Sequence, residues 1–453
     1  MSRAARTPAS TIRHVDSPVP PPGRPFRIQS PALPGFDAPG SDAGRPRVRA
    51  SGLDMAHSHH RGALVIGPLD LPVLPEAVER IIRLAHVGPH ARVGLIPSAT
   101  ERRWAFAPDA AARAVTEAPP LSPGEAPTRL FDELTALPER PLRIVIAGDH
   151  LALDFDHGLG DVTLLHLIVD VLVGAIDPDD LPSPHAIPPL LVASAAVAVD
   201  PRRLVALARF HRDRPRAPVS PPAVRRELKP RHPASASVRI PAHRVDAVRT
   251  ARTESIPGTG IFSVYTVALV RGLTAAGVYL DPMVTLPFDA RGALPRGWTT
   301  HANFAAGLAF PIDIQTRPAD LQRDMTASAR MGRPTANLAL ASLKTRSRSR
   351  VRRAMQAALT VPAHGPIRAE LLHSSVGHLP GRTRGWQWAG SGQPTVIGTG
   401  VPPSAAGITV TTAFVEGAIT MTAAFRDDVF DPTLIRSALD SVQRHAADLV
   451  GAS

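Results

Sequence analysis

The chain of 453 residues contains no cysteine. This absence excludes disulfide bonds, zinc–thiolate sites and catalysis by a thiol nucleophile. Aromatic residues are also scarce, at 4% of the chain, although hydrophobic residues make up 44%. A folded body of this length must therefore be filled mainly by leucine, valine, isoleucine and alanine, and two domains are expected.

Long apolar runs are absent as well. No uninterrupted apolar segment approaches the roughly 18 residues that a membrane-spanning helix requires. Arg3 and Arg6 are not followed by an apolar stretch, so the first residues do not have the pattern of a secretory signal. We therefore expect no membrane-spanning segment and a cytoplasmic location.

Lysine is nearly missing, because only Lys229 and Lys344 of the 51 basic residues are lysines. Together with abundant alanine, proline and glycine, this composition is typical of a GC-rich genome such as that of an actinobacterium. The formal net charge of +12 invites a nucleic-acid-binding interpretation, but the arginines are dispersed and no aromatic–basic stacking surface is visible. We therefore rank nucleic-acid binding last among the candidate functions.

Composition divides the chain into four parts. Residues 1–60 are rich in proline, arginine, serine and glycine without apolar periodicity, which predicts a disordered tail. Residues 61–211 and 234–453 are each expected to form an α/β unit, with a proline- and arginine-rich linker over 212–233.

A group of histidines ends the expected tail. His57, His59 and His60, with Asp54 nearby in the sequence, have side chains that can bind a metal ion. A solvated tail is the favoured interpretation of this group, and we predict no metal site.

The hydrophobic periodicity predicts helices flanking a mixed sheet in each half, which is an α/β (α+β) fold class. Near the N-terminus, residues 98–138 are expected to be irregular. Strands are expected over 91–97, 142–147, 151–156, 235–240, 279–287, 303–314, 367–373, 395–399, 407–414 and 418–425, and helices over 75–84, 162–172, 200–211, 242–252, 260–276, 317–330, 336–359 and 432–449.

One loop combines a histidine with a strand end. His157 follows the strand expected over 151–156, and Asp161 precedes the helix expected over 162–172. A histidine held at a strand end is suited to general-base chemistry, and an aspartate at this place can cap the helix. Gly158 and Gly160 are expected to allow backbone angles that other residues resist.

The spacing of this histidine and aspartate is weak evidence by itself. With 18 histidines in 453 residues, the pattern His-x-x-x-Asp arises about once by chance. A second copy, His150 and Asp154, lies within the preceding strand, where no loop aims the side chains. On spacing alone, a loop histidine that hydrogen-bonds local backbone groups is the favoured interpretation of His157.

The order of these elements and several further segments resemble the chloramphenicol-acetyltransferase-like superfamily over about residues 62–450. This superfamily includes peptide-condensation domains, wax-ester synthases and polyketide-associated acyltransferases. The segments that carry the resemblance are Pro141–Ile146, Asp156–Val162 with the His-x-x-x-Asp motif, Val284–Arg291, Asn303–Phe304, Ser374–Pro380, and Gly407 through Phe430–Pro432 to Leu449.

The resemblance implies two lobes with a tunnel between them, in which His157 acts as general base on a hydroxyl or amine acceptor. An acyl thioester of coenzyme A or of an acyl carrier protein would be the donor, with no bound cofactor. Asp161 and Arg291 would pair to fix the loop geometry. Asn303, Ser374 and Ser375 would be candidate contacts to the tunnel or to a developing oxyanion, although structural hydrogen bonding within strands is an equal alternative.

The chain departs from the family motif at several positions. Asp156 replaces the first motif histidine, Val162 replaces the glycine after the aspartate, and Ser375 replaces an asparagine. Because a side chain at 162 would narrow the passage, a family member that has lost catalysis and acts as a binding or scaffolding module is the alternative hypothesis.

A basic cluster lies between the Asn303 and Ser374 segments. Arg350, Arg352 and Arg353 belong to it and are candidates for docking the phosphates of coenzyme A or an acidic carrier protein. A solvated start of a helix is the alternative interpretation of the cluster.

Overall fold

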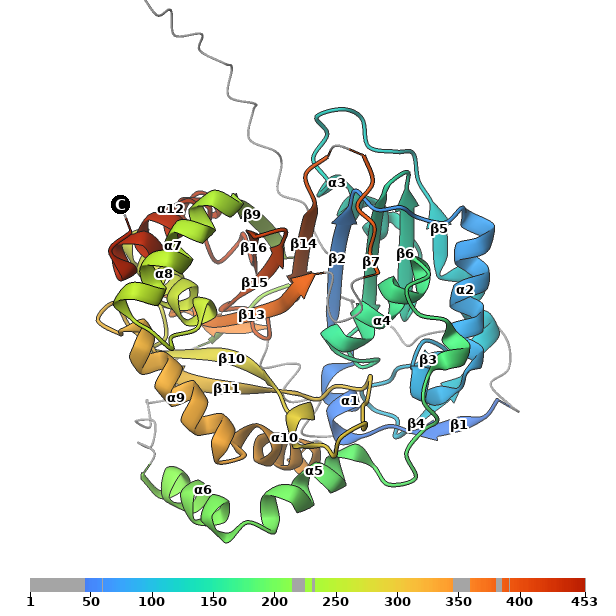
Figure 1. Ribbon diagram of the computed structural model, residues 1–453, viewed down its shortest axis with the longest axis horizontal. Coiled ribbons are helices and arrows are strands. Elements are labelled where there is room, and N and C mark those ends of the chain that lie inside the picture. Colours follow the sequence, from blue (N-terminus) through green and yellow to red (C-terminus); the bar gives the residue numbers. More distant parts are fainter. Residues whose placement is uncertain are drawn as a thin grey trace, which may run out of the picture.

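The computed structural model describes residues 45–58, 60–213, 225–229, 233–344, 359–379, 385–390 and 392–452. Two sheets, each covered by helices, lie side by side and form the two lobes of the molecule (Figure 1). No helix among these residues is long and apolar enough to cross a membrane. The predicted mixed α/β fold class is confirmed.

The first sheet has the strand order β14-β2-β7-β6-β5. Only β5 and β6 are parallel in it. Alternation along β2 places Leu64 and Ile66 on the face covered by α2 and α4, and Ala63 and Val65 on the face covered by α3. The bounds are β2 Arg61–Gly67, β5 Val115–Glu117, β6 Leu142–Ala147, β7 His150–Asp156, β14 Thr395–Gly400, α2 Leu74–His86, α3 Arg129–Ala136 and α4 Val162–Leu172.

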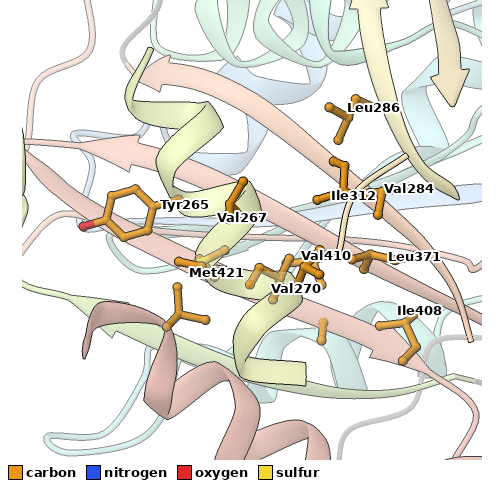
Figure 2. Close-up of a cluster of buried hydrophobic side chains, with 14 of the residues drawn as sticks. Tyr265, Val267, Val270, Val284, Leu286, Ile312, Leu371, Ile408, Val410 and Met421 are labelled. Atoms are coloured by element: carbon orange, nitrogen blue, oxygen red, sulfur yellow. The ribbon is translucent and has the colours of Figure 1, made fainter. Parts of the chain in front are cut away.

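The second sheet has the order β11-β10-β13-β15-β16-β9, with α8 and α12 packed together on it. Figure 2 shows Val267 and Val270 of α8 among apolar side chains of the strands, including Leu371, Val410 and Met421. The bounds are β9 Ala234–Ile240, β10 Met283–Asp289, β11 Ala305–Pro311, β13 Glu370–Leu379, β15 Gly407–Val415, β16 Ala418–Phe425, α7 Ala242–Ser255, α8 Ile261–Ala275 and α12 Pro432–Val450.

The division at residues 211 and 234 predicts two lobes that follow each other in the sequence, and this prediction is wrong. Strand β14 belongs to the second half but pairs along its length with β2, from Thr395 opposite Gly67 to Gly400 opposite Gly62. Conversely, α5 Pro189–Ala198 precedes the expected linker but packs beside α10 Arg333–Lys344, and in α6 Pro201–Asp213 the Phe210 ring lies 4.3 Å from the Arg333 guanidinium. The second half of the chain therefore contributes a strand to the first lobe, and the first half contributes helices that pack on the second lobe.

The predicted tail is too long at its C-terminal end. Within it, β1 Arg47–Arg49 pairs with β4 Arg103–Phe106, and α1 Gly52–His57 buries Leu53 and Met55. Ser51 caps α1, because its hydroxyl accepts the Asp54 N–H at 3.1 Å while the Asp54 carboxylate accepts the Ser51 N–H. Residues 1–44 of the expected tail lie outside the described residues.

Other predicted elements differ in extent. The expected strand 91–97 shortens to β3 Leu95–Ile96, and the region expected to be irregular contains β4, β5 and α3. The helix expected to reach residue 359 is described only as α10, because 345–358 lie outside the described residues. The expected linker 212–233 contributes β8 Arg225–Glu227, which pairs with β12 Thr360–Pro362. The helix expected over 317–330 is α9 Pro318–Arg330.

Candidate active site

The loop from His157 to Asp161 joins β7 to α4, as the sequence predicts. Its first turn is held by backbone bonds, since the His157 N–H donates to the His60 carbonyl at 2.6 Å. The Gly158 N–H donates to the Asp156 carboxylate at 2.7 Å. Asp156, which stands in place of the first motif histidine, therefore shapes the turn that presents His157.

His157 and Asn303 hydrogen-bond to each other twice. The Asn303 Nδ2 donates to the His157 carbonyl at 2.7 Å, and the Asn303 Oδ1 lies 2.9 Å from the His157 Nδ1. The carbonyl fixes the amide orientation, so the amide oxygen faces the ring. Because that oxygen can only accept, Nδ1 carries the proton and Nε2 carries the lone pair.

Asp161 and Arg291 form the ion pair that the motif predicts. The Arg291 Nη2 lies 2.9 and 3.0 Å from the two carboxylate oxygens of Asp161. The same carboxylate accepts the N–H groups of Thr163 at 3.0 Å and Phe304 at 2.9 Å. Asp161 thus caps α4 and is fully engaged in structural bonds.

Arg291 also holds the segment that carries Asn303. Its guanidinium donates to the carbonyls of Thr300 and Ala302, each at 2.8 Å, and lies 5.8 Å from the ring centre of Phe304. Asn303 is therefore fixed from both sides, by Ala302 and Phe304. The ion pair thereby positions the residue that orients His157.

The two loop glycines are required for a reason other than the predicted one. Neither Gly158 nor Gly160 has a positive φ. A Cβ at Gly158 would lie 2.5 Å from the Ser58 hydroxyl oxygen, and a Cβ at Gly160 would lie 2.3 Å from the His301 carbonyl oxygen. Close packing of the loop against its neighbours, and not backbone angles, demands glycine at both positions.

Arg92 is a site residue that the sequence analysis missed. Its guanidinium donates to the carbonyls of Leu159 at 2.6 Å and Gly158 at 2.9 Å, and it pairs with Asp54 at 2.8 Å. These bonds hold the loop carbonyls on the side of α1. Nothing in the local sequence of Arg92 signals this role, because the two loop carbonyls that it contacts are more than sixty residues away.

His57 is the second missed residue, since the sequence analysis assigned it to a solvated tail. Its ring stacks on that of His157 at a centroid distance of 5.0 Å and an angle of 27°. Burial, reinforced by the neighbouring His157 and His60, lowers the pKa of His57 to about 3. His57 is therefore uncharged and packs against His157 at one side of the site. The described residues contain no cluster of side chains that could hold a metal ion.

The serine candidates lie in strand β13 and do not hydrogen-bond to His157 within the described chain. Ser374 pairs with Thr411 and Ser375 with Thr412 in the register with β15, which shifts between Ser375 and Gly377. The Ser375 hydroxyl accepts the Gly377 N–H at 3.0 Å. Ser375 therefore forms a structural hydrogen bond within its strand, which is the alternative that the sequence left open.

The donor-docking candidates Arg350, Arg352 and Arg353 lie outside the described residues.

A cavity of about 280 Å³ adjoins the site. Asn303 and Phe304 line one part of it, and Pro188, Pro189 and Leu190 at the start of α5 line another. His301 also lines it, and burial together with Arg291 lowers the pKa of His301 to about 4. The cavity therefore extends from the positioning residue Asn303 to the N-terminal end of helix α5.

No protein-family model matches the chain, and no curated protein matches it in sequence. Solved structures do resemble it. Trichothecene 15-O-acetyltransferase from Fusarium sporotrichioides aligns over 94% of this chain and 98% of its own, with 11% identity and a TM-score of 0.55. Polyketide synthase associated protein 5 from Mycobacterium tuberculosis aligns over 89% of this chain and 100% of its own, with 13% identity and a TM-score of 0.52.

The epimerization domain of tyrocidine synthetase B aligns over 91% of this chain and 99% of its own, with 12% identity and a TM-score of 0.51. Each of these alignments covers at least 89% of this chain, which is more than either lobe alone contains. The chain therefore has the two-lobed fold that the resemblance predicted, the chloramphenicol-acetyltransferase-like fold.

Proposed function

We propose that this protein is an acyltransferase that moves an acyl group from a thioester to a hydroxyl or amine acceptor, with His157 as general base. The observation that carries the proposal is the double hydrogen bond between His157 and Asn303. It fixes the ring in the tautomer whose Nε2 can take a proton, which is what the attacking group must lose.

The reaction needs one base and no redox partner. As the acceptor oxygen or nitrogen attacks the thioester carbonyl carbon, its proton passes to the Nε2 of His157. The tetrahedral intermediate then collapses, the carbon–sulfur bond breaks, and the imidazolium returns the proton to the thiolate. Asn303 accepts from Nδ1 throughout, and the Asp161–Arg291 pair holds Asn303 in place without exchanging protons.

The donor in this proposal is an acyl thioester of coenzyme A or of an acyl carrier protein. The fold is shared with an acetyltransferase, with a polyketide synthase associated protein and with a domain of a peptide synthetase, which supports either donor. A cytoplasmic role in lipid or natural-product biosynthesis is part of the same proposal.

The test is thiol release from a panel of acyl-coenzyme A donors in the presence of pooled alcohol and amine acceptors. Wild type is compared with His157→Ala and Asn303→Ala, and with His86→Ala as a matched control on the exposed side of α2. We expect His157→Ala to lower the rate by about 10²- to 10⁴-fold and His86→Ala to leave it unchanged. Asn303→Ala should fall between them.

Two results would contradict the proposal in different ways. Thiol release that survives in His157→Ala would show that another group is the base. No release by folded wild type, either with coenzyme A donors or with a loaded carrier protein, would favour the alternative of a binding or scaffolding module. Val162 in place of the motif glycine is the observation behind that alternative.

A further inference from the structure

Helix α5 exposes an apolar stripe. Leu191, Ala195, Ala198 and Val199 follow the spacing of one helix face, and all four are exposed. Leu191 is 62% exposed, and Val199, the C-cap that follows the last residue of α5, is 78% exposed. A surface helix ordinarily carries polar residues on this side, so the stripe requires an explanation.

The opposite face of α5 is apolar too and is already occupied. Ala193 and Val197 are buried there, and the helix packs beside α10. The exposed stripe is therefore not the core-facing side of the helix. It is a second apolar face that no described residue covers.

Helix α6, which contacts α5, also exposes apolar side chains and adds positive charge. Leu204 and Val205 are 46% and 49% exposed. Arg202 and Arg209 lie seven residues apart on the exposed side, and neither forms an ion pair within the described residues. By contrast, Arg203 pairs with Asp200 at 3.4 Å. We call the exposed residues of these two helices, Leu191, Val199, Arg202, Leu204, Val205 and Arg209, the α5–α6 surface.

This surface lies at the margin of the molecule. Figure 1 shows α5 and α6 along the lower edge of the view, beyond α10 and away from both sheets. The two helices contact each other, and α5 also contacts α10. A flat partner can therefore approach the α5–α6 surface without meeting the sheets.

We propose that the α5–α6 surface binds an anionic lipid membrane. Exposed aliphatic side chains beside unpaired arginines are the combination that seats a helix at a bilayer interface, where the aliphatic groups enter the acyl boundary and the guanidinium groups meet lipid phosphates. The net charge of +12 attracts the whole protein to such a surface. Arginine also reaches phosphate with two parallel hydrogen bonds, which suits a phospholipid headgroup.

The position of the cavity suggests that membrane binding serves substrate delivery, an inference that rests on the proposed function. Pro188, Pro189 and Leu190 line the cavity directly before Leu191 begins the exposed stripe, and Asn303 lines it elsewhere. A membrane on the α5–α6 surface would lie near this lining. An amphiphilic acceptor or donor could then pass from the bilayer toward His157 without crossing bulk water.

The experiment is co-sedimentation of the full chain with vesicles of phosphatidylcholine mixed with phosphatidylglycerol, against vesicles of phosphatidylcholine alone. We expect binding to the anionic vesicles that weakens with salt. Leu191→Ser/Val199→Ser should weaken it about tenfold, through lost apolar burial. Arg202→Glu/Arg209→Glu should weaken it about thirtyfold or more.

Matched controls separate this surface from the rest of the chain. Val73→Ser changes a valine that is 69% exposed before α2, and Arg436→Glu changes an exposed arginine of α12. Both should bind vesicles as wild type does. Thiol release from a water-soluble thioester reports on His157 separately, so an inactive protein that still binds vesicles would leave this proposal standing.

Two results would overturn the proposal. The first is no binding of wild type to anionic vesicles. The second is vesicle binding that both double variants retain, because another segment would then hold the lipid. If the first result comes with loss, in both double variants, of binding to an acidic carrier protein, the surface serves a protein partner instead.

Discussion

Removing the carboxylate of Asp161 should destabilise the protein strongly while leaving the identity of the base unchanged. The side chains of Asp161 and Arg291 are 6% and 12% exposed, so this ion pair is shielded from water. Among the described residues, Asp161→Ala leaves the guanidinium of Arg291 with one acidic partner, the more exposed Asp289 at 3.0 Å. It also removes the acceptor of the Thr163 and Phe304 N–H groups.

The size of the effect follows from these lost bonds. Removing one partner of a buried ion pair costs about 3–5 kcal/mol, and each buried N–H left without an acceptor adds to the cost. The contact of Arg291 with Asp289 offsets part of it. We therefore expect Asp161→Ala to lower the free energy of unfolding by about 3–5 kcal/mol.

The assay is urea unfolding of wild type, Asp161→Ala, Arg291→Met and the double variant. The double variant should be less destabilised than the sum of the single variants, with a coupling energy of about 2 kcal/mol. A loss below about 1 kcal/mol for Asp161→Ala, with no coupling, would refute the structural role assigned here. The structural role would also be refuted if a folded Asp161→Asn variant lost the dependence of the thiol-release rate on pH that wild type shows.

Two further predictions concern packing and pH. Gly160→Ala should reduce thiol release at least about tenfold, because its Cβ would meet the His301 carbonyl oxygen at 2.3 Å and displace the loop; wild-type activity in this variant, with Gly292→Ala in open space as the control, would contradict the packing argument. The buried His57 and His373 have pKa values lowered to about 3, mainly by burial, from an unfolded value of 6.5. Below pH 6.5 these histidines are therefore protonated in the unfolded chain but neutral in the folded chain. As the pH is lowered, the free energy of unfolding falls by about 1.4 kcal/mol per pH unit for each histidine. This contribution to stability is fully present above pH 6.5 and is lost as the pH falls toward 3. His373→Gln should reduce the slope measured by urea unfolding at stepped pH; an unchanged slope would show that His373 is not the group responsible.

The segment that carries the motif could be predicted almost to the residue. Strand β6 and helix α4 have the bounds expected from periodicity, and Asp161 caps α4 as predicted. These features depend on neighbours within a few residues, which hydrophobic spacing and capping residues report directly. The pairing of Asp161 with Arg291 came from a family motif and not from spacing.

The surroundings of His157 could not be predicted because they are assembled over long distances. Asn303 lies 146 residues from His157 in sequence, and Arg92 lies 66 residues from Gly158. His57 comes from a segment whose composition predicts disorder, yet α1 is buried by contacts that include α10. Composition reports what a segment tends to do alone, whereas these residues are ordered by partners elsewhere in the chain.

The pairing of β14 with β2 has a consequence for how this chain can be divided. A polypeptide that stops before residue 234 would lack β14, so the hydrogen-bonding groups of β2 from Arg61 to Gly67 would form an open sheet edge. Such an edge is a template for aggregation, and Val396 would also be missing from the core beneath it. The sheet of the first lobe can therefore be completed only after the ribosome has added the chain as far as β14, residues Thr395–Gly400.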